Sequence, residues 1–299
     1  MTVVNRIETQ QAAFTSHADW FAEFLKNTDQ KKVTQVAILD GLKKYPVWGR
    51  IVDPTATLDL LYIGAGTGGL EIPLTQSLKQ MHGNPAYMSV HCMDPSEQMK
   101  QGFALAAGQA GLTDCNLDYS IACFEDSGYR PPMADFAVAS HVWYYIDSWR
   151  GVSEAENSLA KFARSINPGG VGLIALQSAT SDNYTIRSVQ SPKIHGTPEL
   201  SGEEISEELS RLAIPHQSFV IDAHTDVSSC FQGGTFNPTS EGKLLLSFIL
   251  RSNWYRPTED DEVNQQIRED VGRQLTEIVG KNSAEQMIFK DRYMWIPGQ

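Results

Sequence analysis

Short apolar runs alternate with amphipathic segments through the middle of this chain. Leu58–Ile63 reads LDLLYI, which is typical of a strand buried on both faces of a parallel sheet. Further strands are predicted at 87–93, 117–121, 135–140 and 171–177, with helices between them at 71–80, 95–108 and 153–166 and a turn at 167–170. This alternation predicts a doubly wound α/β sheet with its ligand at the carboxyl ends of the strands.

The flanks of this region have other patterns. Residues 1–50 have helical spacing, with Trp20 and Phe24 on one predicted helix and 33–39 on a second. Residues 178–200 are polar and are predicted to be irregular, as an insertion or a lid. Beyond them the patterns predict a helix from Ser201, a strand at 218–222, a helix at 260–280 and a last strand at 287–296, and leave 244–250 ambiguous between helix and strand.

A glycine-rich loop, GAGTGG, follows the first predicted strand and begins at Gly64. Glycine permits positive φ and lets a ligand approach the bare backbone, and the N–H groups of the following helix suit a nucleotide-like cofactor. The spacing fits both the G-x-G-x-x-G of dinucleotide sites and the G-x-G-x-G of methyltransferases. The loop alone therefore leaves the cofactor open, and a turn without any ligand is a further interpretation.

Composition excludes several classes of partner. The net charge is −12, from 24 basic and 36 acidic residues, and no Lys/Arg-rich stripe interrupts it, so no nucleic-acid partner is expected. The four cysteines form no C-x-x-C pair and are expected to be reduced. No signal peptide, membrane-length apolar run or H-E-x-x-H motif is present. We therefore expect a cytoplasmic protein without a metal or a membrane partner.

The end of the second predicted strand narrows the choice of cofactor. Asp94 stands there, and a carboxylate at that place accepts hydrogen bonds from a ribose diol. The residues from Asp94 to Met99 read DPSEQM, and this D-x-S-x-x-M arrangement resembles class I S-adenosylmethionine-dependent methyltransferases. The resemblance spans 58–177. It implies a Rossmann-like α/β fold, with a mostly parallel seven-stranded sheet, helices on both faces, and a helical N-terminal or inserted substrate cover.

The same resemblance implies S-adenosylmethionine as cofactor and S-adenosylhomocysteine as product. It implies a single methyltransferase domain over 1–299, with a helical cover at 1–54, a cofactor-binding core at 55–178, and a substrate-side insertion with the rest of the sheet at 179–299. The cofactor-binding residues that it implies are Gly64, Ala65, Gly66, Gly68, Asp94, Pro95, Met99, Glu125, Asp126 and Ser140. Tyr62 departs from the pattern, because the superfamily usually has an acid two positions before the first glycine.

That departure is shared by the histamine N-methyltransferase-like family, which this chain resembles at 14–29, 140–146, 226–231, 244–248 and the terminal IFKDRYMWIP. The resemblance implies that Asp29 contacts the ammonium of the substrate and acts at the catalytic centre with Tyr145. His141 and Asp291 stand where the family has amide side chains, so histamine itself is not the expected substrate. The implied aromatic pocket contains Phe14, Trp20, Phe24, Tyr144 and Phe231, and Asp291 completes the substrate-binding set.

These residues predict in-line methyl transfer to a nitrogen of a small amine or imidazole compound. His141 is the candidate base, and Asp29 with Asp291 would pair with a cationic tail. Each also has a purely structural interpretation: a loop acid, a core histidine, or an aromatic that only packs. The alternative functions are an O- or C-methyltransferase of specialised metabolism and, because of Tyr62, a degenerate fold that only binds. A monomer or a homodimer with a small, possibly cationic substrate is expected.

Overall fold

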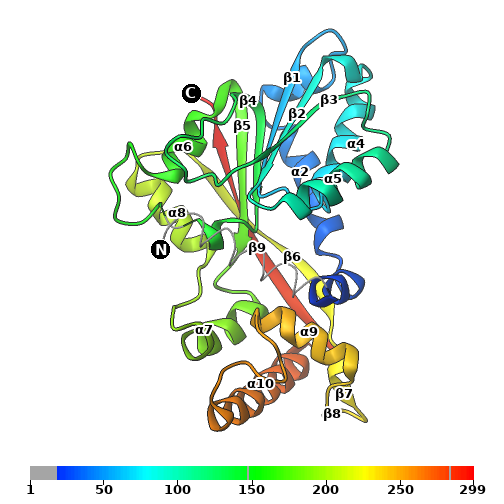
Figure 1. Ribbon diagram of the computed structural model, residues 1–299, viewed down its shortest axis with the longest axis vertical. Helices are drawn as coiled ribbons and strands as arrows, with labels where there is room; N and C mark the ends of the chain where they lie inside the picture. Colours follow the sequence, from blue (N-terminus) through cyan, green and yellow to red (C-terminus); the bar gives the residue numbers. More distant parts are fainter. Residues whose placement is uncertain (1–18, 147, 283) are drawn as a thin grey trace. The chain divides into compact units, whose positions relative to one another are not determined.

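The computed structural model describes residues 19–146, 148–282 and 284–299. They form a seven-stranded sheet in the order β3-β2-β1-β4-β5-β9-β6 and a two-stranded sheet of β7 and β8 (Figure 1). The strands are β1 (Leu58–Ile63), β2 (Met88–Asp94), β3 (Asn116–Ile121), β4 (Ala134–Ser140), β5 (Ile166–Gln177), β6 (Gln217–Asp226), β7 (Phe231–Gln232), β8 (Thr235–Phe236) and β9 (Gln286–Pro297).

The helices connect these strands and flank the sheet. They are α2 (Gln30–Leu42), α3 (Val47–Ile51), α4 (Glu71–His82), α5 (Glu97–Gln109), α6 (Ser158–Arg164), α7 (Asp182–His195), α8 (Gly202–Arg211), α9 (Ser240–Leu250) and α10 (Asp261–Asn282). Residues 19–27 are helical as well, and Trp143–Tyr145 form a single 3-10 turn. Figure 1 shows α4 and α5 next to the β1–β2–β3 end of the large sheet.

The order of the strands confirms the predicted doubly wound fold. β1 pairs in parallel with β2 on one side and with β4 on the other, while β3 pairs with β2 and β5 with β4. The chain therefore moves outward from β1 to β3 and then returns to the other side of β1. Ligands of such folds bind where the strand order reverses, outside the carboxyl ends of the strands. Here that place lies beyond Ile63 of β1 and Ser140 of β4.

Two predictions need correction in this part of the chain. The turn expected at 167–170 is a bulge inside β5, because Ala134 pairs with Ile166 while Phe136 already pairs with Val171. Gly169 has φ +77° there, which a residue without a Cβ adopts readily. The helix expected at 153–166 covers only Ser158–Arg164. It begins late because the side chain of Asn157 accepts hydrogen bonds from the N–H groups of Leu159 and Ala160.

The segment expected to be irregular, 178–200, contains the helix α7. Its buried face is largely polar, and Pro192 lies inside it, so the sequence gives little helical signal there. The ambiguous run 244–250 is helical, and its helix α9 begins after Thr239, whose side chain accepts the N–H of Gly242. The apolar residues of α9 are buried in a cluster that also contains Phe24, Phe231 and Phe289.

The chain divides into two compact units. The sheet unit comprises Thr34–Leu176, Gly202–Phe219 and Arg292–Gln299, and the insertion unit comprises the described part of Met1–Val33, Gln177–Ser201 and Val220–Asp291. In the sheet unit, Trp295 stacks on Tyr45 and Phe136, with ring centroids 5.3 and 6.3 Å away. The predicted division of the chain at residues 54 and 178 stays a prediction.

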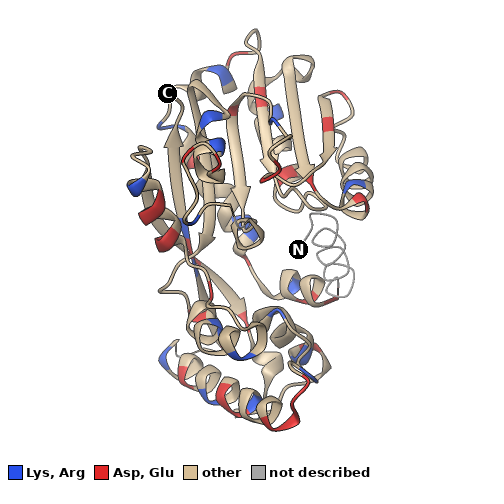
Figure 2. Cartoon of the chain, turned by 60° about the vertical axis from the view of Figure 1, so that its left-hand side comes forward, with Lys and Arg blue, Asp and Glu red and all other residues tan. Residues whose placement is uncertain are grey.

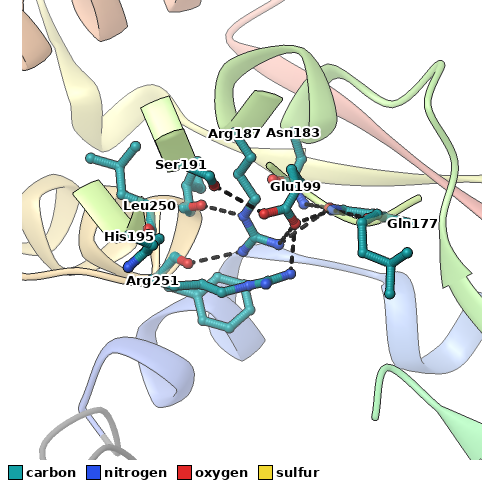
Figure 3. Close-up of polar contacts among 11 residues, drawn as sticks. Gln177, Asn183, Arg187, Ser191, His195, Glu199, Leu250 and Arg251 are labelled. Carbon is teal, nitrogen blue, oxygen red and sulfur yellow. Dashed lines mark hydrogen bonds and ion pairs between the residues drawn. The ribbon is translucent and has the colours of Figure 1, made fainter. Parts of the chain in front are cut away.

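The insertion unit contains a buried polar network, which we call the Glu199 network (Figure 3). Glu199 accepts hydrogen bonds from Ser191 Oγ at 3.0 Å, Arg251 Nη2 at 2.8 Å and Gln177 Nε2. Arg187, 5% exposed, lies with Nη1 3.9 Å from Glu199 Oε1 and donates to two backbone carbonyls of α9, at Phe248 and Ile249. A buried pair with this many hydrogen bonds fixes the position of 177–199 against α9.

Charged residues are distributed without a basic stripe among the residues shown in Figure 2, where Lys and Arg alternate with Asp and Glu along the elements. Within the described residues, the helices are all too short or too polar to cross a membrane. All four cysteines are buried and free, as expected for reduced thiols.

Candidate functional site

The glycine loop leaves β1 at the point where the strand order reverses. Gly64, Gly66 and Gly68 have φ values of +67°, +53° and +85°, so each occupies the left-handed region that the sequence predicted for glycine. The backbone of the loop is held in place, because Ala65 N–H donates to the carbonyl of Met93 at 3.0 Å. The N–H of Gly68 then closes a turn on Ala65 O at 2.9 Å, after which α4 begins.

The glycines have different neighbours. A Cβ built at Gly64 would lie 2.4 Å from Val142 Cγ2, and one at Gly68 would lie 2.5 Å from Ile72 Cδ1. A Cβ at Gly66 would meet no atom within 4 Å among the described residues. Gly64 therefore permits close packing of the loop against the segment after β4, whereas Gly66 presents bare backbone to open space.

Asp94 lies beside Gly66 at the end of β2. One carboxylate oxygen accepts the N–H of Gly66 at 3.3 Å and the other accepts the N–H of Ser96 at 3.0 Å. The residue is 6% exposed, and this burial raises the pKa of its carboxyl, while the two backbone hydrogen bonds oppose the rise. Ser96 in turn caps α5 by accepting the N–H of Met99 at 3.3 Å. The predicted cofactor residues Asp94, Pro95 and Met99 thus lie on one turn, which the Asp94 carboxylate joins to Gly66.

The loop after β3 contains Glu125 and Asp126, both half-buried. Lys161 of α6 fixes this loop, because its ammonium donates to the carbonyl of Phe124 at 2.6 Å and to that of Asp126 at 3.0 Å. The same ammonium lies 5.0 Å from the centre of the Phe124 ring. Burial lowers the pKa of Lys161, and the nearby Arg130 lowers it further.

The segment after β4 contains the candidate base. His141 has φ +55°, and its N–H donates to Ala175 O of β5 at 2.9 Å. A residue with a Cβ seldom adopts this conformation, and such residues occur disproportionately at functional sites. The His141 ring lies 6.3 Å from the Tyr144 ring, which meets the Tyr145 ring edge-on at 6.3 Å.

One polar atom at the end of β4 has its hydrogen-bonding capacity unused. Ser140 Oγ is buried, and no described residue forms a hydrogen bond with it. A buried hydroxyl of this kind costs free energy unless a ligand or water satisfies it. With Gly64 and Val142 in contact nearby, Ser140, His141 and the glycine loop lie at the carboxyl ends of adjacent strands.

Several of the residues predicted for the substrate, among them Asp29 and Asp291, lie in the insertion unit. The Asp29 carboxylate accepts the backbone N–H of His224 at 2.7 Å, and Asp291, 3% exposed, accepts Gln30 Nε2 at 2.8 Å. Thr28 and Thr225 form an isolated bridge next to them, so this turn is attached to β6. Trp20 is half-buried in the first described helix, and Phe14 lies outside the described residues.

Two predicted pocket aromatics are core residues of the insertion unit. Phe24 is 1% exposed and stacks on Phe248 with the ring centroids 4.1 Å apart. Phe231 is 9% exposed and meets Phe236 edge-on at 6.0 Å. The structure therefore places the predicted cofactor residues, with His141, Tyr144 and Tyr145, in the sheet unit. It places the described members of the remaining substrate set in the insertion unit: Trp20, Phe24, Asp29, Phe231 and Asp291.

Three positioning residues were not predicted. Tyr119 of β3 donates its hydroxyl to Gly66 O at 2.9 Å, Lys161 fixes the loop at 124–126, and Gln30 donates to Asp291. Strand alternation indicates that the Tyr119 side chain is buried on one face of the sheet. Its hydrogen bond to Gly66, however, depends on how β3 pairs with β2, where Tyr119 stands beside Cys92. Lys161 and Gln30 occupy ordinary helical positions, and no local pattern distinguishes them.

No protein-family model matches the sequence, and none of the curated proteins matches it either. Among solved structures, magnesium protoporphyrin IX methyltransferase from Synechocystis PCC 6803, with bound S-adenosylhomocysteine, superposes with a TM-score of 0.51 at 14% identity, over 72% of this chain and 92% of the other. A putative sarcosine dimethylglycine methyltransferase from Galdieria sulphuraria has a TM-score of 0.48 at 14% identity, over 89% of this chain and 85% of its own.

The first likeness shows that this chain has the Rossmann-like fold of the class I methyltransferases, as predicted. At this level of identity it shows the fold alone. The resemblance to the histamine N-methyltransferase-like family, and the roles of the individual site residues, stay predictions.

Proposed function

We propose that this protein is an S-adenosylmethionine-dependent methyltransferase that methylates a nitrogen of a small amine or imidazole compound. One observation carries the proposal: the bare backbone of Gly66 and the buried carboxylate of Asp94 lie side by side where the strand order reverses. A carboxylate at the end of the second strand suits the ribose diol of the cofactor. The open glycine backbone suits the part of the cofactor that extends from that ribose. The bound S-adenosylhomocysteine in the Synechocystis enzyme of the same fold supports this choice of cofactor.

The residues present fit that cofactor. Asp94 would accept the ribose hydroxyls, Met99 would flank the adenine, and the loop at Glu125–Asp126 would receive the adenine amino group. The unsatisfied Ser140 Oγ supplies a further hydrogen-bonding group at the same edge of the sheet. Gly64, Ala65 and Gly68 shape the loop so that Gly66 is open. These assignments follow the predicted set and do not depend on the insertion unit.

The chemistry asked of the protein is limited, because bound S-adenosylmethionine supplies a methyl group already activated on a sulfonium. The side chains then have to orient a neutral nucleophile and remove its proton. His141 is suited to the second task, since a neutral imidazole nitrogen can accept a proton from the nucleophile. Tyr144 and Tyr145 extend an aromatic surface from it, which suits a flat or cationic substrate.

A nitrogen acceptor is favoured over a phenol or a carbon acid by the acids in the insertion unit. Asp29 is half exposed, with its carboxylate hydrogen-bonded to the backbone of His224, and it would pair with a cationic group of the substrate. Trp20, Phe24, Phe231 and Asp291 belong to the same predicted set. Phe24 and Phe231 also form the core of that unit, so their variants must be checked for folding.

Titration calorimetry tests the cofactor. We expect S-adenosylmethionine to bind with a Kd in the micromolar range, on the order of −8 kcal/mol. Asp94→Asn should weaken binding at least about tenfold, because an amide replaces a charged acceptor, while Asp118→Asn, on β3, should not change it. Undetectable binding to the wild-type protein would refute the proposal.

Product mass spectrometry with amines, imidazoles and phenols then identifies the acceptor atom. Methylation of a phenol or a carbon acid, and of no amine or imidazole, would replace the nitrogen proposal by the O- or C-methyltransferase alternative. Cofactor binding without turnover on any substrate class would favour the fold that only binds.

A further inference from the structure

A serine and a histidine outside the cofactor region are hydrogen-bonded to each other in the sheet unit. Ser206 lies in the middle of α8, and His216 stands immediately before β6. Ser206 Oγ and His216 Nε2 are 2.8 Å apart, and both residues are half-buried, so part of the pair is open to solvent. The proposed methyl transfer gives neither residue a role.

The second ring nitrogen of His216 fixes the direction of this hydrogen bond. His216 Nδ1 lies 3.1 Å from the backbone carbonyl of Ile214, which can only accept, so Nδ1 carries the proton of the neutral ring. Nε2 is then the unprotonated nitrogen, and it accepts the hydroxyl proton of Ser206. A nucleophile, a base and a group that orients the base thus stand in series, which is the arrangement that activates a serine hydroxyl.

The turn between α8 and β6 returns His216 to the helix. At the end of α8, the N–H of Ile214 donates to Leu209 O at 2.9 Å, and Ala213 has φ +52° inside this closure. Glycine is the usual residue at such a place, because the left-handed conformation disfavours a Cβ. The chain therefore reverses within a few residues and brings the imidazole back to Ser206.

Arg292 of β9 holds together the two elements that carry the pair. Its guanidinium donates to Glu203 of α8 at 2.9 and 3.0 Å and to Ser218 of β6 at 3.0 Å. Glu203 and Ser206 are neighbours on the helix surface, three residues apart. Ser218 follows His216 by two residues, so the bridge through Arg292 lies next to the serine–histidine pair. The pair is therefore held in place before any substrate arrives.

We propose that Ser206 is a nucleophilic hydroxyl that becomes acylated by activated carboxylic esters and thioesters. Ser206 Oγ attacks the carbonyl carbon while its proton passes to His216 Nε2. The bond from that carbon to the leaving oxygen or sulfur then breaks, and the leaving group takes the proton from His216. The products are an ester on Ser206 and a free alcohol, phenol or thiol, without any oxidant or reductant. This reaction is independent of the proposed methyl transfer.

The probe is p-nitrophenyl acetate, and peptide mapping by mass spectrometry locates the acetyl group. We expect it on Ser206 of the wild-type protein, in a form that hydroxylamine removes, because hydroxylamine cleaves esters and leaves lysine amides intact. Ser210 is the matched control: it is exposed, one turn further along α8, and donates its hydroxyl to Ser206 O at 3.0 Å and not to a histidine. Ser210 should react at least about a hundredfold more slowly, the factor that a positioned base contributes.

Three variants separate reactivity from structure. His216→Gln keeps a side chain that can hydrogen-bond with Ser206 but is no base, so acetylation of Ser206 should slow by about a hundredfold or more. Ser206→Ala should abolish the mapped ester, and Ser210→Ala should leave it unchanged. Urea unfolding checks that each variant is folded, and if one is not, the relative rates at Ser206 and Ser210 in the wild-type protein decide. An unlabelled Ser206, equal rates at the two serines, or an unchanged rate in His216→Gln would overturn the proposal.

Discussion

At the scale of single residues, the backbone at His141 is unusual, and only Ala213 and Arg251 share its positive φ among the described residues with a Cβ. Its φ of +55° places a Cβ-bearing residue in the left-handed region, immediately after Ser140 ends β4. The cost of this conformation is about 1 to 2 kcal/mol for most residues and less for Asn, whose short side chain tolerates it. Cβ-bearing residues in this conformation occur disproportionately at functional sites, which agrees with the role proposed for His141.

These properties separate the backbone role of His141 from its side-chain role. We expect His141→Asn to keep the free energy of unfolding near the wild-type value and to lower the rate of methyl transfer by about a hundredfold or more, the contribution of a general base. His141→Val should lose the same activity and, in addition, about 1 to 2 kcal/mol of stability. Urea unfolding and initial rates measure the two effects. An Asn variant with full activity would show that His141 is not the base.

At the scale of elements, the N-terminal cap of α6 has a well-defined structural role. Asn157 is fully buried, accepts the N–H groups of Leu159 and Ala160, and donates its amide to Trp149 O at 2.8 Å and Glu208 Oε1 at 3.2 Å. Its one side chain therefore begins the helix and also ties the preceding loop to α8.

We expect Asn157→Ala to lower the free energy of unfolding by about 2 kcal/mol, at the upper end for a lost cap, because the carbonyl of Trp149 and the carboxylate of Glu208 lose their donor as well. Asn157→Ser keeps a cap oxygen and introduces no charge beside Glu208, so it should cost less. Denaturant unfolding measures both variants. An effect of the Ala variant no larger than that of the Ser variant would show that the cap contributes little.

The sequence predicts an element well when the side chains on its buried face are apolar, and poorly when they are polar. The strand Leu58–Ile63 was predicted with its observed bounds, because an apolar run between polar flanks is a local signal. The helix α7 was missed because its buried positions include Asn183 and Arg187, which belong to the Glu199 network, and Gln190, which donates to Gln274 of α10. A helix with a polar buried face lacks apolar residues at helical spacing. Only its contacts in the folded protein identify the segment as a helix.

The same distinction holds for the candidate site. Asp94 and Ser96 were predicted together because they stand in one short motif, DPSEQM, and Gly66 because it belongs to the glycine-rich loop after the first strand. Tyr119, Lys161 and Gln30 act on residues 35 to 261 positions away, so their roles depend on strand pairing and helix packing. Local spacing therefore predicts the cofactor turn and leaves the residues that fix it unidentified.

At the scale of the whole molecule, the Glu199 network makes stability depend on pH. Burial alone would raise the pKa of Glu199, but the guanidinium groups of Arg251 and Arg187, with hydrogen bonds from Ser191 and Gln177, outweigh it and lower the pKa. A carboxyl whose pKa is lower in the folded state contributes stability above its unfolded pKa of about 4.3. That contribution is lost as the pH falls through the folded pKa.

We therefore expect Glu199→Gln to lower the free energy of unfolding by about 3 to 5 kcal/mol near neutral pH, because it leaves buried arginine without its counter-ion. Below a pH of about 4.3, the stability of the variant should fall less steeply than that of the wild type. Glu259→Gln changes an exposed glutamate and should alter neither quantity. Parallel pH profiles for wild type and Glu199→Gln would contradict this account of the network.

The hydrogen bonds that hold Gly66 from both sides have a consequence for the rate of ligand capture. A loop of glycines has the largest conformational entropy of any sequence, and a mobile loop would have to give it up each time a ligand arrives. Here Asp94 and Tyr119 hold Gly66 at its N–H and its carbonyl, so that entropy is lost once, when the chain folds. Association should then follow a single diffusional step without a slow loop closure.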